Sequence, residues 1–188
     1  MGSLPDNVGG EMNHYFSMFD DFSRDVISEV FDNADFVIRY IGQICESDDD
    51  LEAIEETVCF LGLRWQDVTP ELLRRRFTAF SFFTEMAFFS FMPSVIAASI
   101  EDPLSSHLAI ENIIGTLPEP SSFYLREFYG RRWRMFNARQ LNYLKTWIKC
   151  PEAQFRSYFD LSDLDEAVSA IDRYLCVASD LEDRAHVF

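Results

Sequence analysis

Residues 84–101 read TEMAFFSFMPSVIAASIE, and within them residues 86–100 are the longest uncharged run of the chain. The run is apolar on all sides, which is typical of a helix at the centre of a domain. Thr84 followed by Glu85 is a suitable start for that helix. The run is shorter than the ~20 residues that a bilayer span needs, and Pro93 interrupts it. We therefore predict a central, Phe-rich buried helix that is kinked or broken at Pro93, and no membrane span.

Apolar residues recur at helical spacing through most of the remaining chain, which predicts amphipathic helices. Thr69, Asp102 and Ser162 are suited to cap the starts of three of them, and a proline follows each of the first two. Asn137 with Gln140 three residues later resembles a capping box. We predict further helices over residues 20–31, 48–61, 70–76, 103–115, 122–134, 137–150 and 162–175.

One segment, residues 34–44, is apolar and rich in β-branched side chains, and the pattern leaves helix and strand open there. Seven glycines and seven prolines are few for a sandwich of short, turn-linked strands. We predict an all-α fold, a compact single-domain bundle of about six to eight helices. The domain is expected to span residues 15–178, between a flexible N-terminal arm over 1–14 and a C-terminal tail over 179–188.

Negative charge is concentrated at the front of the chain. Residues 1–62 hold 15 Asp or Glu and two Arg, a net charge of −13, whereas residues 63–150 carry +3 and residues 151–188 carry −6. A field of this sign repels nucleic acid and anionic membranes and attracts a basic partner at long range. At 48% hydrophobic residues the chain is nevertheless too apolar for a disordered acidic protein.

The cysteines predict a reduced, cytoplasmic protein. Cys45, Cys59, Cys150 and Cys176 form no C-x-x-C pair and have no histidine at zinc-finger spacing. We expect mostly buried free thiols, as in proteins of the cytoplasm. Residues 1–11 are polar and lack the basic and apolar regions of a signal peptide.

Motifs that carry chemistry are missing from the sequence. The three histidines, His14, His107 and His186, lie far apart, and the chain contains no H-E-x-x-H, P-loop, G-x-G-x-x-G or G-x-S-x-G motif. His107 is expected to be a surface or packing residue. We therefore predict no enzyme, no cofactor and no metal site.

The carboxylates around the start of the 48–61 helix are the strongest candidates for partner binding. Leu51, Ile54, Val58 and Leu61 form one stripe, which we expect to be buried, and the acidic side chains lie on another side. The alternative is that this acidic face is only solvated. A second acidic strip precedes it, and the full candidate set is Asp48, Asp49, Asp50, Glu52, Glu55, Glu56, Asp20, Asp21, Asp25 and Glu29.

Two arginine clusters, residues 74–76 and residues 131–134, stand against this acidic background. The second lies near aromatic side chains, a combination that also occurs in proteins that stack nucleic-acid bases. The net charge of the chain argues against that interpretation. We predict instead that the arginines pair with the acidic N-terminal part of the same chain.

Three stretches carry a family resemblance. Residues 62–72 read GLRWQDVTPEL, residues 82–93 read FFTEMAFFSFMP, and residues 135–141 read MFNARQL. Together they resemble a family of small bacterial proteins of unknown function, with a W-x-D-V-T-P-E-L motif followed by F-F-T-E-x-x-F-x-x-x-x-P. Met92 departs from the leucine that this family tends to have.

The resemblance covers roughly residues 49–148 and implies a fold more than an activity, because that family has no established activity. It implies a bacterial setting, a core position for Trp65 and a capping role for Thr69. A small, acidic, helical and cytoplasmic bacterial protein without catalytic motifs fits an immunity or inhibitor protein. Such a protein would bind and neutralise a cognate toxin, a nuclease or another basic secreted effector, by occluding its active site.

Two other functions remain open from the sequence. One is a different binding class, a DNA-mimicking anti-restriction protein or an adaptor that loads effectors. The other is an enzyme with an acidic metal site. The preferred expectation is a basic protein partner, probed most directly by reversing Glu52, Glu55 and Glu56 to Lys. We expect this acidic face to need no burial, so the fold should stay intact. Asp163, Asp165 and Glu166 are the control set.

Overall fold

The computed structural model describes residues 20–47, 49–150 and 153–185, without the side chains of residues 154 and 179–185. Within these residues the fold is all-α and compact, as predicted from the sequence. The described part contains ten α-helices, more than the six to eight expected, because several are only one or two turns long. The arm expected over residues 1–14 lies outside the described residues.

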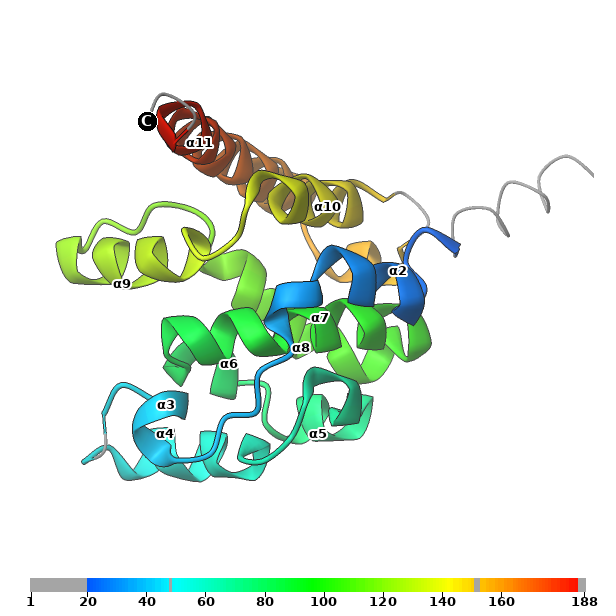
Figure 1. The fold of residues 1–188 in the computed structure, drawn as a ribbon. Coiled ribbons are helices and arrows are strands. Elements are labelled where there is room, and N and C mark those ends of the chain that lie inside the picture. Colours follow the sequence, from blue (N-terminus) through cyan, green and yellow to red (C-terminus); the bar gives the residue numbers. More distant parts are fainter. Residues whose placement is uncertain (1–19, 48, 151–152, 186–188) are drawn as a thin grey trace, which may run out of the picture.

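Helix α7 (Glu85–Glu101) lies at the centre of the molecule (Figure 1). The shorter helices α3 (Ile41–Ile44), α4 (Leu51–Thr57) and α5 (Pro70–Arg75) lie together at one end of the fold, at the bottom of the figure. Helices α2 (Arg24–Val30) and α8 (Pro103–Gly115) pack against α7. Helix α6 (Ala79–Phe82) packs against α4 and α8.

The remaining three helices form the opposite end of the fold. They are α9 (Phe123–Trp133), α10 (Ala138–Lys149) and α11 (Leu161–Ala185). Helices α10 and α11 pack along each other, whereas α9 contacts α7 and extends outward to the left of Figure 1. Because α11 continues to Ala185, residues 179–185, which we expected in a tail, prolong the last helix. None of the helices in the described ranges combines the length and the apolar character that a bilayer crossing requires.

Helix α7 is buried from Ala87 to Ser99, which confirms the prediction of a central apolar helix. It continues through Pro93, so the proline does not break it. The hydroxyl groups of Ser90, Ser94 and Ser99 donate hydrogen bonds to backbone carbonyl oxygens of the same helix, at 2.6 to 2.8 Å. These three hydroxyl groups are therefore satisfied within their own helix, which limits the cost of their burial.

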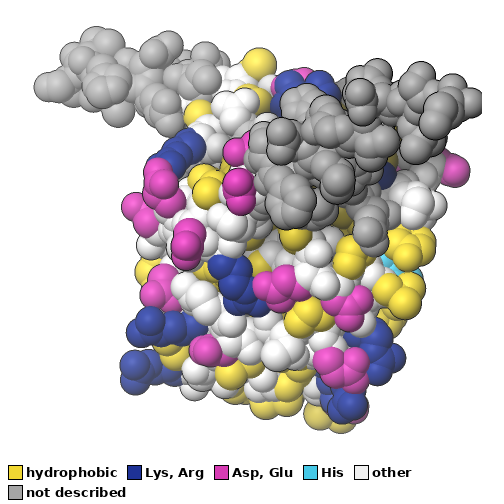
Figure 2. All heavy atoms as spheres, turned by 90° about the vertical axis from the view of Figure 1, so that its right-hand side faces the viewer, with side chains coloured by type: hydrophobic (Ala, Val, Ile, Leu, Met, Phe, Trp, Pro, Cys, Tyr) yellow, Lys and Arg dark blue, Asp and Glu magenta, His cyan; other side chains and the backbone are white. Residues whose placement is uncertain are grey.

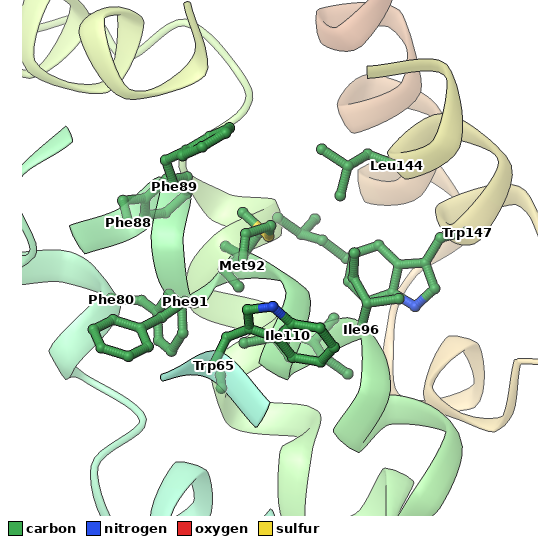
Figure 3. Packing of buried hydrophobic residues seen from close by; sticks show 14 of the residues in the cluster. Trp65, Phe80, Phe88, Phe89, Phe91, Met92, Ile96, Ile110, Leu144 and Trp147 are labelled. Carbon is green, nitrogen blue, oxygen red and sulfur yellow. The ribbon is translucent and has the colours of Figure 1, made fainter. Parts of the chain in front are cut away.

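Aromatic side chains from distant segments meet around α7 (Figure 3). Trp65, in a 3-10 turn over residues 65–67, is 1% exposed, as expected for a core residue. Trp147 of α10 lies on the other side and donates its indole N–H to the Ser99 hydroxyl at 2.9 Å. Phe88 meets Trp133 of α9 with ring centroids 5.3 Å apart. These contacts tie both ends of the fold to one central helix.

Most of the predicted helix starts are confirmed. The side chains of Thr69, Thr84 and Asp102 each accept a hydrogen bond from a backbone N–H in the first turn. Asn137 and Gln140 form the predicted capping box. Ser162 was wrong as a cap, because α11 begins one residue earlier, at Leu161.

The open segment, residues 34–44, is neither a continuous helix nor a strand of a sheet. A 3-10 turn ends at Ala34, an extended stretch follows, and the short helix α3 closes the segment. The Ile38 carbonyl accepts a hydrogen bond from the Gly62 N–H at 2.8 Å, with Gly62 at a φ of 81° that glycine adopts without strain. Buried Ile38 and Ile44 explain the apolar pattern of the segment.

Candidate partner-binding surfaces

The first candidate surface lies at α4. Asp50 caps this helix by accepting hydrogen bonds from the backbone N–H groups of Glu52 and Ala53, at 3.0 and 3.2 Å. Asp49, Asp50 and Glu52 are exposed and form no ion pair within the described residues. Asp48 lies outside the described residues. The start of α4 thus presents carboxylates that a partner can reach, with one of them also holding the end of the helix.

The buried face of α4 differs from the one that we expected. Leu51 and Val58 of the predicted apolar stripe are 81% and 44% exposed, whereas Ala53, Thr57 and Phe60 are buried. For Val58 the reason is that the α-helix ends at Thr57 and a 3-10 turn follows, so the 3.6-residue period does not continue through the segment. The Thr57 hydroxyl donates to the Ala53 carbonyl oxygen at 2.6 Å, which satisfies it inside the core.

Glu56 faces the protein rather than the solvent. Its side chain is 19% exposed and accepts hydrogen bonds from Arg76 at 3.1 Å and from the Thr78 hydroxyl at 2.6 Å. The neighbouring Glu55 is 77% exposed and lies 3.8 Å from Arg76. The expectation that this acidic face needs no burial was therefore wrong for Glu56, which joins α4 to the segment after α5.

The second acidic strip lies on α2 and before it. Asp20, Asp21 and Asp25 are exposed, and Glu29 pairs with Arg139 of α10 at 2.6 Å. Helix α2 packs on α7 and α10, whereas α4 packs on α6, at the other end of the fold (Figure 1). The acidic residues that the sequence places in one N-terminal segment are thus divided between separate surfaces. Acidic and basic side chains are interspersed on the face that Figure 2 shows.

The arginine clusters pair internally, in part as predicted. Arg131 bridges Glu46 and Glu85 at 2.7 Å each, and Arg76 pairs with Glu56. These contacts join helices to the acidic N-terminal part. Arg74 and Arg75 instead bind Glu71 on their own helix, and their hydrogen bonds lower the pKa of Glu71 to about 2.

Arg132 has a role that the sequence did not show. Its side chain is fully buried, and its guanidinium donates to the backbone carbonyl oxygens of Phe80, Ser81 and Phe83, where α6 ends. The guanidinium carbon also lies 3.8 Å from the centroid of the Phe128 ring. Burial lowers the pKa of Arg132 to about 10. A cation at the carbonyl end of a helix is favourable, so Arg132 anchors α9 to the end of α6.

A third acidic surface is a groove between α8 and the start of α11, which we name the acidic groove. It has a volume of about 390 Å³ and is lined by the carboxylates of Glu111, Asp160, Asp163 and Glu166 beside Tyr158. None of these four carboxylates forms an ion pair with a basic side chain in the described part of the chain. Asp163 and Glu166, chosen from the sequence as controls, therefore belong to a candidate surface themselves.

The histidine, cysteine and carboxylate side chains of the described residues do not gather into one site. No cluster of three or more His, Cys, Asp or Glu side chains able to hold a metal ion occurs in the described ranges. His107 contacts the Tyr158 ring with centroids 5.0 Å apart and lies 2.6 Å from the Leu104 carbonyl oxygen, a packing role. Cys45, Cys59 and Cys176 are free thiols; Cys45 is buried and Cys176 is exposed. Cys150 is also buried.

No protein-family model matches the chain, and we found no match among curated proteins or solved structures. The resemblance to bacterial proteins of unknown function stays a prediction from the three motifs. The geometry of the described residues therefore carries the functional argument. It consists of exposed carboxylates at α4, at α2 and in the acidic groove.

Proposed function

We propose that this protein is an acidic immunity or inhibitor protein, which binds a basic toxin or effector and occludes its active site. The distribution of ion pairs supports the proposal. Most basic side chains of the chain are paired with its own carboxylates, namely Arg24, Arg64, Arg74, Arg75, Arg76, Arg131, Arg134, Arg139 and Lys145. Among the described residues, exposed carboxylates such as Asp49, Glu52 and Asp163 have no cation beside them, in a chain whose net charge is −16.

The single observation that carries the proposal is the presence of such uncompensated carboxylates at α4 and in the acidic groove. Carboxylates arranged on a rigid surface attract a basic partner over distance and increase the rate of its association. In the complex they would occupy positions where the partner binds phosphate or another anion. The bacterial setting and the cytoplasmic location are parts of this proposal, motivated by the motif resemblance and the free thiols.

The proposal is tested by expressing this protein together with the product of each adjacent gene, and by measuring cell growth and binding. A basic product that inhibits growth alone and is neutralised by this protein is the expected result. The α4 variant is Asp49→Lys with Glu52→Lys and Glu55→Lys, which leaves Glu56 intact. The groove variant is Asp163→Lys with Glu166→Lys.

Asp165→Lys is the control, because Asp165 is exposed on α11 but does not line the acidic groove. We expect the α4 variant to slow association by about tenfold or more and to lose protection, while Asp165→Lys protects normally. If the groove variant alone loses protection, the partner docks at the acidic groove instead of α4. If all three variants protect equally, the inhibitor proposal does not depend on these carboxylates and is wrong as stated.

A further inference from the structure

A groove of opposite character lies between α9 and the C-terminal half of α11, and we name it the α9–α11 groove. Two adjoining hollows of about 190 and 230 Å³ share the side chains of Arg134, Tyr174 and Val177. The floor is apolar and contains the buried residues Trp133 and Phe136. In Figure 1 helix α9 extends to the left, below the C-terminal part of α11.

The first turns of α9 are exposed beside this groove, to which they contribute Arg126 and Glu127. Residues 121–127 are all exposed, with Phe123 at 78% and Tyr124 at 70%. Large apolar side chains exposed together on a projecting helix are typical of a surface that binds another protein. Only the second half of α9 is buried, where Arg132 reaches the end of α6 and Trp133 contacts Phe88 of α7.

Three arginines, Arg126, Arg134 and Arg173, line this groove together. Arg173 forms no ion pair among the described residues, and Arg126 donates only to the Pro120 carbonyl oxygen, at 3.4 Å. Arg134 pairs with Glu127 at 3.4 Å, and both of these side chains are more than half exposed. An exposed pair of this kind is weak and is easily exchanged for a better carboxylate partner. In a chain of net charge −16, this groove therefore offers guanidinium groups next to apolar surface.

We infer that the α9–α11 groove binds an acidic, amphipathic segment of a protein partner. Its apolar side chains would cover Phe123, Tyr124 and the floor of the groove, and its carboxylates would pair with Arg126 and Arg173. Guanidinium groups bind carboxylates through two parallel hydrogen bonds, which suits a short segment with a few fixed charges. Nucleic acid fits less well, because a polyanion needs an extended basic surface, whereas the three arginines here are interspersed with Glu119 and Glu127, an arrangement that suits a segment with only a few carboxylates.

This inference goes beyond the proposed function, since it concerns a different surface and a partner segment of opposite charge. Either proposal can fail while the other holds. The proposed function is tested with variants at α4 and in the acidic groove, and the inference with variants at α9 and α11.

The probe is a synthetic amphipathic peptide with Glu on one face and Leu and Trp on the other. The matched control peptide has Lys in place of every Glu. Both are titrated into the isotope-labelled full chain and followed by NMR. We expect the acidic peptide to shift the amide signals of α9 and α11, and the basic peptide to leave them unchanged. Arg173→Glu should weaken binding of the acidic peptide by about tenfold.

Arg39→Glu is the matched control, because Arg39 is also exposed, forms no ion pair among the described residues, and lies outside the groove. It should bind the acidic peptide like the unmodified protein. Phe123→Ser with Tyr124→Ser should weaken binding without changing the urea midpoint, since both side chains are exposed. The inference is overturned if the acidic peptide leaves α9 and α11 unchanged, or if Arg173→Glu and Arg39→Glu bind it equally. Tighter binding of single-stranded DNA or phosphatidylserine vesicles at the same residues would overturn the class of partner.

Discussion

Arg76 donates a hydrogen bond to Glu56 at 3.1 Å and holds the end of α5 against α4. The Thr78 hydroxyl donates to the other carboxylate oxygen of Glu56 at 2.6 Å. A carboxylate with two such donors and a side chain only 19% exposed is part of the folded structure. Its neighbour Glu55 remains open to solvent, so adjacent glutamates have different roles.

Glu56→Ala is expected to lower the free energy of unfolding by about 1–3 kcal/mol, because it leaves the donors of Arg76 and Thr78 without their acceptor. Glu55→Ala is the control and should change it by about 0.5 kcal/mol or less, because Glu55 is 77% exposed. Urea unfolding of the two variants measures the difference. Equal effects would contradict the structural role of Glu56.

Arg132→Met is expected to lower the free energy of unfolding by about 3 kcal/mol, since the carbonyl oxygens at the end of α6 lose a charged donor inside the core. Arg132→Lys should restore only part of this loss, because an ammonium group lacks the planar array of donors. Arg134→Met is the control on the exposed side of the same turn. In thermal and urea unfolding, the stability of Arg134→Met should be nearest to that of the unmodified protein. Any other order of stability would contradict the role of Arg132 in anchoring α9 to α6.

We expect the protein to lose stability at alkaline pH because of the Tyr143 hydroxyl group. Its hydroxyl donates to the Asp21 carbonyl oxygen at 2.9 Å, and burial raises the pKa of Tyr143 above its ordinary value of about 10. The folded state therefore favours the neutral phenol. The contribution of this phenol to stability is fully present below pH 10. It is lost as the pH rises toward the pKa of Tyr143 in the folded state, because over this range the unfolded chain has already released the proton.

Tyr143→Phe should cost about 1 kcal/mol at neutral pH through the lost hydrogen bond, and it should make the decline above pH 10 shallower. Tyr40→Phe, at an exposed side chain, should leave the pH profile unchanged. Unfolding free energies measured across the alkaline range test both statements. A decline as steep in Tyr143→Phe as in the unmodified protein would show that another group controls it.

Local features of this fold could be predicted from the sequence, and contacts between distant segments could not. Thr69, Thr84 and Asn137 act within one helical turn, so their capping roles follow from neighbouring residues. The buried face of α4 depends on the 3-10 turn after Thr57, which the apolar period does not reveal. The position of Arg132 under α6 depends on how α9 packs.

The same limit applies to the candidate surfaces. The sequence identified the exposed carboxylates at the start of α4 but grouped them with Glu56 and with the α2 strip. The acidic groove requires that Glu111 of α8 meets Asp163 and Glu166 of α11, and no local pattern pairs these helices. The α9–α11 groove was equally hidden, although the aromatic and basic composition of residues 123–134 was a visible signal.

The acidic groove should reduce the stability of the free protein. Glu111, Asp160, Asp163 and Glu166 line it together without a cation among the described residues, so their mutual repulsion disfavours the folded state. Glu166→Lys should therefore raise the free energy of unfolding by about 0.5 kcal/mol at low salt, and the gain should disappear near 1 M salt, where the screening length is about 3 Å. Asp165→Lys, on the same helix but outside the groove, should give a smaller gain. Urea unfolding at the two salt concentrations measures this difference.

Surfaces that lower the stability of a folded protein are commonly binding sites. A salt-dependent gain in stability in Glu166→Lys therefore supports a basic partner for the acidic groove. Equal gains in both variants, or a gain that persists at high salt, would instead assign the effect to the net charge or to local helix stability.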